Sequence, residues 1–400
     1  MVNVAVLGYG TVGSGIVEVI KENQDMVNQK AAAEIDVKYI LDLRDFPGDK
    51  YEHLVVHDYE QILSDDSVDI ICEAMGGVEP AYTFSKNALL KGKSVCTSNK
   101  ELVAVHGPEL LEIARQHNCS YLFEASVGGG IPIIRPINSS LTPEKIEAVT
   151  GILNGTTNYI LTKMEKEGSD FDAVLKEAQE KGYAERNPEA DIEGYDACRK
   201  IAILSSLAYG STVNYEEVYT EGITKISTKD FKYMKELGAT IKLLGMSKAE
   251  GGSCYAMVAP FVLFPSHPLY SVSDVFNGIL VRGNMLGDTM YYGRGAGKLP
   301  TASAVVSDVI ECARNIGRSV PCFWNPEKQA LSDAADVKRR FFVRVSETDK
   351  AKIEDAFGSV EVIDAGLTDE TGFITEVMSE KEYKEKAAQL TVVSMLRIEE

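Results

Sequence analysis

Apolar runs and helical patterns alternate over the first third of the chain. Runs rich in apolar residues lie at 2–7, 35–41, 68–77, 94–97 and 120–125. Runs of this length and composition predict buried strands. Strands that alternate with helices predict a parallel sheet covered on both faces. We therefore expect an α/β domain over residues 1–130, whose last helix lies at 107–117.

The pattern changes after about residue 144. Amphipathic helices are expected at 159–167 and 170–182, whereas the later segments 211–250 and 253–282 mix helix and strand signals. This mixture predicts a central α+β domain over residues 131–299. A glycine loop at 293–300 then leads into helix 300–318, which we expect to return to the first domain.

A linker composition at 321–338 precedes a third, small domain, expected over residues 335–400. The pattern there predicts, in order, strand 340–346, helix 348–357, strands 360–365 and 372–378, helix 380–388 and strand 391–398. This βαββαβ order is the ferredoxin-like plan.

A glycine-rich turn joins the first strand to a helical pattern. Gly8, Gly10 and Gly13 form GxGxxG, with Thr11 and Val12 between the last two glycines. The first glycine permits a tight turn, the second lets the backbone approach a pyrophosphate, and the third lets helix pack on strand. The context of strand, turn and helix predicts a dinucleotide site with the pyrophosphate at the helix N-terminus.

Two charged residues follow the second strand. An acid at the position of Asp42 typically binds the ribose 2′-hydroxyl of NAD, whereas an Arg such as Arg44 accommodates the 2′-phosphate of NADP. Both residues are present. NAD and NADP therefore both stay open, and solvated loop charges are the alternative for either side chain.

Residues 182–210 pass from a polar loop into a nearly apolar helix. Asp196 and Lys200 are four residues apart, which places them on one helix face. An exposed ion pair is the simplest interpretation of this spacing. Because the sequence that follows is apolar, Lys200 is also expected to be partly buried, which makes it a candidate for proton transfer.

A second glycine-rich turn spans residues 124–132. Glycines at this density leave carbonyl groups free to point inward, and with Glu124 they suggest a site for a hard cation. A tight turn at a domain boundary, without any ion, is the alternative.

Charge and cysteine content exclude several classes of protein. The net charge of −19 argues against nucleic acid and anionic membranes as partners. The seven cysteines show no zinc-ligand spacing and fit a reducing compartment. A strand begins directly after Met1, which leaves no room for a signal peptide, and no apolar run approaches the ~20 residues of a membrane span. We expect a cytoplasmic enzyme.

Six motifs together resemble homoserine dehydrogenase over essentially the whole chain. They are residues 8–13, 97–100, 124–133, 151–160, the pair of segments 182–185 and 196–200, and 293–297. The resemblance implies reversible NADP- or NAD-dependent reduction of L-aspartate 4-semialdehyde to L-homoserine, on the route to threonine and methionine. It also implies a homodimer, formed through the central domain.

The resemblance assigns residues to roles. Lys200 matches the proton-transfer lysine, Asp196 the residue that holds it, and Lys100 a second lysine near the developing alkoxide. Matches to the substrate site are Glu185, Asp191, Gly155, Thr156 and Tyr183. Matches to the cofactor site are Gly8, Gly10, Thr11, Val12, Gly13, Asp42, Arg44, Thr97, Ser98, Lys100 and Gly295. Glu124, Val127, Gly129 and Ile131 match a structural sodium site.

Two departures from the family pattern concern the cofactor and regulation. Leu41 stands where NADP-preferring relatives often carry Arg, which weakens the prediction of NADP. Residues 346–350 lack the Pro-Gly of an ACT-type effector site, so threonine feedback is a hypothesis. Another amino-acid semialdehyde reductase and a non-catalytic sensor are the rival functions; the combination of Lys100, Asp196, Lys200 and Glu185 argues against the sensor.

Overall fold

The computed structural model describes residues 1–250 and 253–400. The chain forms two compact units, which we call the first and the second unit. The first unit comprises Met1–Glu144, Ala202–Asn214 and Gly293–Gln329, and the second comprises Lys145–Ile201, Tyr215–Tyr292 and Ala330–Glu400. No helix within the described ranges combines the length and the apolar character that crossing a bilayer requires.

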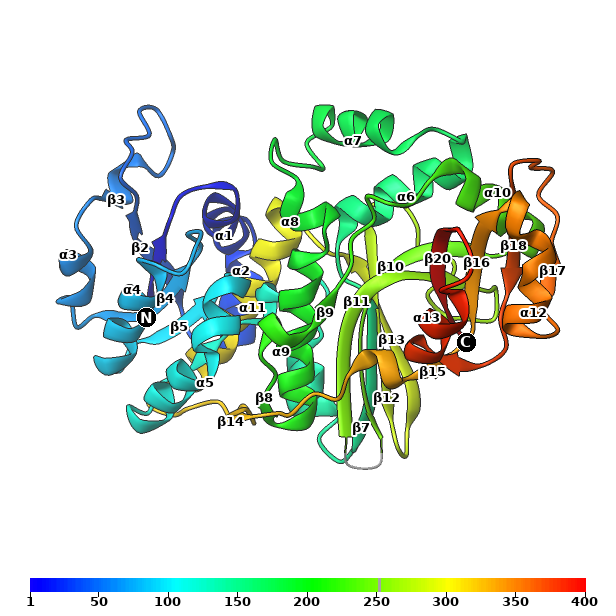
Figure 1. Ribbon diagram of the computed structural model, residues 1–400. Helices are drawn as coiled ribbons and strands as arrows, with labels where there is room; N and C mark the ends of the chain where they lie inside the picture. Colours follow the sequence, from blue (N-terminus) through cyan, green and yellow to red (C-terminus); the bar gives the residue numbers. More distant parts are fainter. Residues whose placement is uncertain (251–252) are drawn as a thin grey trace. The chain divides into compact units, whose positions relative to one another are not determined.

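A six-stranded parallel sheet forms the centre of the first unit (Figure 1). Its strands are β1 (Val2–Leu7), β2 (Ile35–Leu41), β3 (Val55–Val56), β4 (Val68–Glu73), β5 (Ser94–Thr97) and β6 (Tyr121–Leu122). Their spatial order is β3-β2-β1-β4-β5-β6, the order of a doubly wound dinucleotide-binding sheet. The α/β fold predicted for this region is confirmed.

Helices cover both faces of this sheet. They are α1 (Thr11–Glu22), α2 (Gln24–Ala31), α3 (Tyr59–Leu63), α4 (Ala81–Leu90), α5 (Lys100–Gln116) and, from much later in the chain, α11 (Lys298–Arg314). A Cβ on Gly15 of α1 would lie 3.0 Å from Ala302 of α11, so these two helices pack closely. Val305 and Val309 of α11 belong to the same buried core as Val4 and Ile16.

Helix α5 begins seven residues before the start expected from the sequence. Asn99 caps it, because its side-chain Oδ1 accepts hydrogen bonds from the N–H groups of Glu101 (3.2 Å) and Leu102 (3.1 Å). Pro108 lies inside the helix, although proline there removes a backbone donor. The expected helix 107–117 therefore lacks the first seven residues of α5, 100–106.

The second unit is built on a ten-stranded sheet. The central strands are β7 (Ile146–Ile152), β10 (Thr240–Glu250), β11 (Ser253–Leu263), β12 (Phe276–Gly283) and β13 (Gly287–Arg294). The short strand β9 (Tyr219–Thr220) pairs with β11. The helices are α6 (Gly155–Glu167), α7 (Phe171–Glu180), α8 (Glu189–Ile192), α9 (Tyr195–Tyr209) and α10 (Thr228–Leu237). Helix α9 begins in the second unit and continues into the first.

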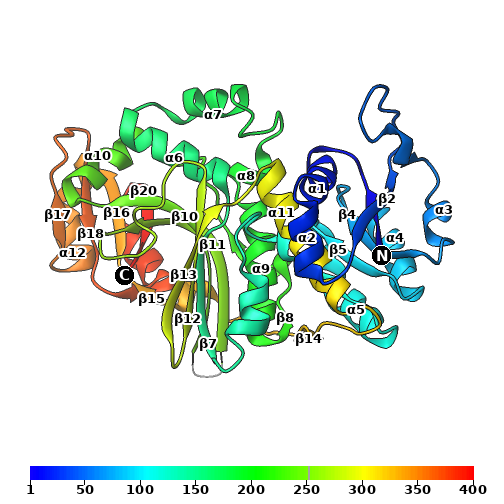
Figure 2. The ribbon, with the colours of Figure 1, turned by 180° about the vertical axis from the view of Figure 1, so that it is seen from behind.

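The C-terminal segment continues the same sheet. It forms β16 (Phe341–Ser346), α12 (Ile353–Phe357), β17 (Glu361–Ile363), β18 (Glu370–Ile374), α13 (Glu380–Ala387) and β20 (Val392–Glu399). β20 lies parallel to β11, with Phe261 opposite Arg397. Figures 1 and 2 show β16, β18 and β17 continuing the sheet beyond β20.

The predicted succession of strands and helices in this segment agrees with the structure, with two local differences. Residues 347–352 form a 3₁₀ turn before α12 instead of the first part of one helix. The strand expected at 372–378 ends at Ile374. The two-residue strand β19 (Met378–Ser379) pairs instead with β15 (Lys338–Arg339), which lies at the end of the expected linker. Helices α12 and α13 share a core with Phe341 and Phe373 on one face of the sheet.

Candidate active site

The glycine turn after β1 meets the steric demands of a dinucleotide loop. Gly8 has φ +90°, which disfavours any side chain. A Cβ on Gly13 would lie 1.8 Å from the carbonyl oxygen of Gly8, so the helix approaches the strand only with glycine there. A Cβ on Gly10 would meet no described atom within 4 Å. The backbone at Gly10 therefore faces open space of the kind a pyrophosphate needs.

The N-terminus of α1 suits an anion. Its first turn contains no acidic residue, and none of the described side chains caps it. The first N–H groups of a helix lack intrahelical partners, and the helix dipole favours negative charge near them. Thr11 and Val12, the first two helical residues, thus offer backbone donors beside Gly10.

Asp42 is held against the glycine turn. Its Oδ2 accepts a hydrogen bond from the N–H of Tyr9 at 2.8 Å. Arg44 donates to both carboxylate oxygens at 2.9 Å, and this guanidinium is the main reason that the pKa of Asp42 lies well below its usual range. The Arg44 side chain itself is 64% exposed. An ionised acceptor and an exposed guanidinium therefore occur together after β2.

Lys200 and Asp196 form a largely buried pair on α9. The Lys200 Nζ donates to Asp196 Oδ2 at 2.6 Å and to the carbonyl oxygen of Leu153 at 2.9 Å. The side chains are 12% and 8% exposed, respectively. The interpretation as an ordinary surface ion pair therefore does not hold, because both groups are shielded from water.

Asn154, a residue that the sequence analysis did not assign to the site, connects this pair to Asp191. Its Nδ2 donates to Asp196 Oδ2 at 2.9 Å and to Asp191 Oδ1 at 2.7 Å. Its Oδ1 accepts from the N–H of Thr157 at 2.9 Å and so caps α6. In the sequence Asn154 was visible as a helix cap, but its second function depends on residues about forty positions away.

The remaining predicted substrate residues lie near the start of α6 and on the loop after α7. Gly155 is the first residue of α6, and the Thr156 hydroxyl donates to the carbonyl oxygen of Tyr183 at 2.7 Å. Tyr183 is 45% exposed, and Glu185 is exposed. Within residues 1–250 and 253–400, no hydrogen bond joins the Glu185 side chain to the cluster around Lys200.

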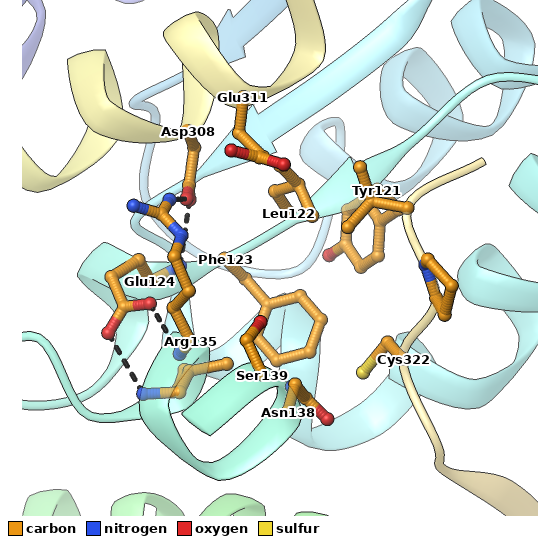
Figure 3. A pocket seen from close by; sticks show the side chains of 13 residues that line it. Tyr121, Leu122, Phe123, Glu124, Arg135, Asn138, Ser139, Asp308, Glu311 and Cys322 are labelled. Carbon is orange, nitrogen blue, oxygen red and sulfur yellow. Dashed lines mark hydrogen bonds and ion pairs between the residues drawn. The ribbon is translucent and has the colours of Figure 1, made fainter. Parts of the chain in front are cut away.

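The glycine-rich turn after β6 contains the predicted cation ligands. The Glu124 carboxylate accepts hydrogen bonds from the N–H groups of Ile133 (2.6 Å), Ile134 (2.9 Å) and Arg135 (2.7 Å), as Figure 3 shows in part. Its side chain thus fixes the turn that follows. Burial raises the pKa of Glu124, and these amides act in the opposite direction.

Three carbonyl groups of the same turn are available as ligands. No donor in the described part of the chain bonds to the carbonyl oxygens of Val127, Gly129 and Ile131. Gly129 has φ +55°, and a Cβ there would lie 2.5 Å from the carbonyl oxygen of Gly295. The turn and the loop before α11 are therefore in close contact, and glycine is required at their crossing.

A buried ion pair lies next to this turn. Arg135 donates to Asp308 Oδ1 at 2.5 Å, and the N–H of Glu124 donates to Asp308 Oδ2 at 2.9 Å. Burial, as the main cause, and the negative charge of Glu124, as the second, raise the pKa of Asp308 to about 7. A cavity of about 290 Å³ adjoins the cluster (Figure 3). Asp308 thus links α11 to the glycine-rich turn that begins at Glu124.

The residues predicted for cofactor and substrate thus divide between the two units. The glycine turn, Asp42, Thr97, Ser98 and Lys100 belong to the first unit, whereas the cluster around Lys200 belongs to the second. Thr97 ends β5 and is fully buried, and Lys100 is the first residue of α5.

Two family models match the chain. Residues 8–124 match the NAD-binding domain of homoserine dehydrogenase, and residues 132–310 match homoserine dehydrogenase. Among similar proteins, the homoserine dehydrogenase of Bacillus subtilis is 39% identical over 356 residues, covering 87% of this chain and 82% of the relative. That of Synechocystis is 46% identical over 315 residues, covering 77% and 72%.

A solved homoserine dehydrogenase from Thiobacillus denitrificans superimposes with a TM-score of 0.91 at 34% identity, covering 100% of this chain and 98% of that one. A hyperthermophilic archaeal homoserine dehydrogenase solved with NADPH has a TM-score of 0.68 at 28% identity, covering 80% and 99%. With these similarities across nearly its full length, the chain belongs to the homoserine dehydrogenase family and is an NAD(P)-dependent oxidoreductase.

Proposed function

We propose that Lys200 is the proton donor and acceptor in the interconversion of L-aspartate 4-semialdehyde and L-homoserine. The observation that carries this proposal is the shielded Lys200–Asp196 pair, 2.6 Å apart. A bound nicotinamide supplies or takes the hydride. As hydride reaches the aldehyde carbon, negative charge develops on its oxygen and needs a proton and a positive neighbour. Lys200 meets the first need, and Lys100 is proposed for the second.

The substrate is proposed to bind between the α6 N-terminus and the two acidic side chains named by the sequence. Asp191 and Glu185 bear the charge that an amino group requires. Gly155 and Thr156 begin a helix, where backbone N–H groups favour a carboxylate. The carbonyl group of Tyr183 accepts a hydrogen bond from the Thr156 hydroxyl and so joins the loop after α7 to α6.

The cofactor is proposed to lie over the glycine turn. Gly8, Gly10 and Gly13 shape the backbone, Thr11 and Val12 offer N–H groups, and residues 97–100 with Gly295 border the nicotinamide. The NADPH complex of the archaeal relative supports use of a phosphorylated cofactor. Asp42 favours an unmodified ribose, whereas the exposed Arg44 favours a 2′-phosphate. The ratio of kcat/KM for the two cofactors measures the preference.

A monovalent cation such as sodium is proposed at the turn after β6. The carbonyl oxygens of Val127, Gly129 and Ile131, with the main-chain carbonyl of Glu124, are the hard ligands that such an ion prefers. The Glu124 carboxylate already accepts from three amides, so we propose that Glu124 contributes to the site mainly by fixing the turn. The ion would stiffen the turn and would take no part in the chemistry.

Assembly, location and regulation are proposed from the family resemblance and from composition. We propose a homodimer formed through the central segment 131–299, and a cytoplasmic location, which the seven free cysteines support. Residues 335–400 are proposed as an ACT-like regulatory domain, and 1–130 with helix 300–318 as the dinucleotide-binding domain. The enzyme would serve threonine and methionine biosynthesis.

One kinetic experiment tests most of these points. Initial rates are measured with L-homoserine and each nicotinamide cofactor, with and without sodium or potassium. We expect oxidation of homoserine with at least one cofactor, and a higher rate with the favoured ion. Activity with other amino-acid semialdehydes but not with homoserine or its aldehyde would overturn the substrate assignment. Initial rates that are the same with and without sodium or potassium would contradict the proposed cation site.

A further inference from the structure

A fully buried carboxylate lies at the carboxyl end of β4, outside the residues assigned above. Glu73 is 0% exposed. Its Oε2 accepts a hydrogen bond from the Thr97 hydroxyl at 2.5 Å, and its Oε1 accepts one from the N–H of Met75 at 2.7 Å. Both oxygens therefore face donors, one on β5 and one on the turn that follows β4.

Thr97 passes this contact on to the start of α5. Its hydroxyl oxygen accepts from the N–H of Asn99 at 2.9 Å. The Asn99 side chain caps α5 and also donates to the carbonyl oxygen of Gly77 at 2.6 Å. Residues 97–99 are thus tied to the turn 73–77, and the next residue is Lys100.

The same turn is packed against the dinucleotide loop. A Cβ on Gly8 would lie 3.0 Å from the carbonyl oxygen of Ala74 and 3.1 Å from the Met75 side chain. The N–H of Ala74 donates to the carbonyl oxygen of Leu7 at 2.9 Å. Glu73 therefore stands between the glycine turn and the segment that begins with Thr97 and ends with Lys100.

The surroundings of Glu73 leave its charge without a cationic partner. In the part of the chain that the structure describes, no basic side chain forms an ion pair with it. The facing groups are Thr97 and Asn99 from β5 and the start of α5, and the buried Tyr121 hydroxyl of β6, which has no hydrogen-bond partner among described residues. Burial raises the pKa of Glu73 to about 7.

We propose that Glu73 is a positioning residue whose ionised carboxylate fixes residues 97–100, and with them Lys100, relative to the glycine turn; this inference rests on the proposed role of those residues. The ionised form accepts from Met75 and Thr97 at once. Protonation turns one oxygen into a donor, so the ionised carboxylate no longer accepts from Met75 and Thr97 together. If Oε2 carries the proton, the Thr97 hydroxyl must rotate, and the charge-assisted hydrogen bond that holds the segment is replaced by a weaker one between neutral groups.

The conservative substitution Glu73→Gln tests the inference, because glutamine has the shape and the donor–acceptor pattern of the protonated acid. The measurement is kcat/KM for homoserine and for the cofactor between pH 6 and 8.5. We expect the ratio of unsubstituted enzyme to E73Q to be near 1 at pH 6 and to rise about 5–10-fold by pH 8. Groups that titrate in both proteins cancel in this ratio.

Asp69→Asn is the matched control. Asp69 lies near the other end of the same strand and accepts a hydrogen bond from the N–H of Asn3. The ratio of kcat/KM between the unsubstituted enzyme and D69N should therefore not change with pH. Glu73→Met, which keeps the bulk but neither acceptor, should lower kcat at least tenfold and raise the cofactor KM. If E73M does not fold, the E73Q profile decides alone.

A constant ratio for E73Q across this pH range would overturn the inference, as would an E73M enzyme with unchanged kcat and KM. A separate experiment tests the proposed function itself. If Lys200→Met remains active, the assignment of the proton donor is wrong whatever the result at position 73.

Discussion

At the scale of single residues, one amide group connects two carboxylates of the candidate active site. Asn154 donates to Asp191 and Asp196 at the same time as its oxygen caps α6. Two carboxylates repel each other, and a shared donor between them offsets that repulsion. Lys200 then bonds both to Asp196 and to the carbonyl group of Leu153, so its ammonium has a fixed direction.

The substitution Lys200→Met should abolish most turnover and leave cofactor binding intact. General acid–base groups contribute about 10²–10⁴-fold, so kcat should fall by that order. Cofactor affinity, followed by nicotinamide fluorescence, should stay within about twofold, because the glycine turn belongs to the other unit. Lys176→Met, on the exposed side of α7, is the control. A K200M enzyme of normal kcat would support the sensor interpretation.

Substitutions of Asn154 separate capping from positioning. Serine is also a good cap but has no amide donors, whereas alanine provides neither and costs about 1 kcal/mol of stability. Asn154→Ser should therefore lower kcat at least tenfold with little change in the urea midpoint, and Asn154→Ala should lower both. Equal turnover in N154S and the unsubstituted enzyme would show that Asn154 is only a cap.

At the scale of elements, two buried ion clusters join the C-terminal strands to the central ones. Arg344 of β16 binds Glu370 of β18 and Asp230 of α10, and all three are almost fully buried. Arg397 of β20 binds Glu380 of α13 and Glu221 next to β9. Since β20 also pairs with β11, the C-terminal segment is part of the sheet of the second unit.

Loss of Arg344 should destabilise the protein strongly. Arg344→Met leaves the buried Asp230 without its cationic partner and Glu370 with only the longer contact to Lys229 (3.3 Å), and breaking a buried pair costs about 3–5 kcal/mol. Arg115→Met is the matched control, because Arg115 also binds both oxygens of a carboxylate, on Glu112, but the pair is exposed. Exposed pairs contribute about 0–1 kcal/mol. Urea unfolding of both variants at one pH measures the difference; equal losses would contradict it.

At the scale of the whole molecule, the chain combines a unit that contains the NAD-binding domain with a second unit that contains both the Lys200 cluster and the C-terminal strands. The C-terminal strands belong to the same sheet as β7, and Leu153, the residue that follows β7, accepts a hydrogen bond from Lys200. One continuous sheet therefore connects the C-terminal segment to the Lys200 cluster.

Threonine titration tests whether this connection is used. If residues 335–400 bind threonine, initial rates of homoserine oxidation should fall as threonine rises through the millimolar range, with cofactor binding unchanged. L-serine and D-threonine serve as controls for specificity. Undiminished rates at millimolar threonine would remove feedback by this amino acid.

The sequence alone determined everything that depends on neighbours along the chain. The GxGxxG turn, the alternation of strands and helices in the first unit and the spacing of Asp196 and Lys200 all follow from local pattern, because turn sterics and helical periodicity act over a few residues. Gly10 and Gly13 have the surroundings expected of them. The predicted start of α5 was wrong, because residues 98–101 were interpreted as a loop although Asn99 caps the helix.

Only the tertiary structure decided which distant groups meet. Asn154 reaches Asp191 and Asp196, Glu73 reaches Thr97, and Arg397 reaches Glu221 across separations that no periodicity encodes. The joining of β20 to β11 likewise depends on which sheet edges remain unpaired after the local elements have formed. Contacts of this kind arise from packing and from the need to satisfy buried polar groups, and both depend on the complete fold.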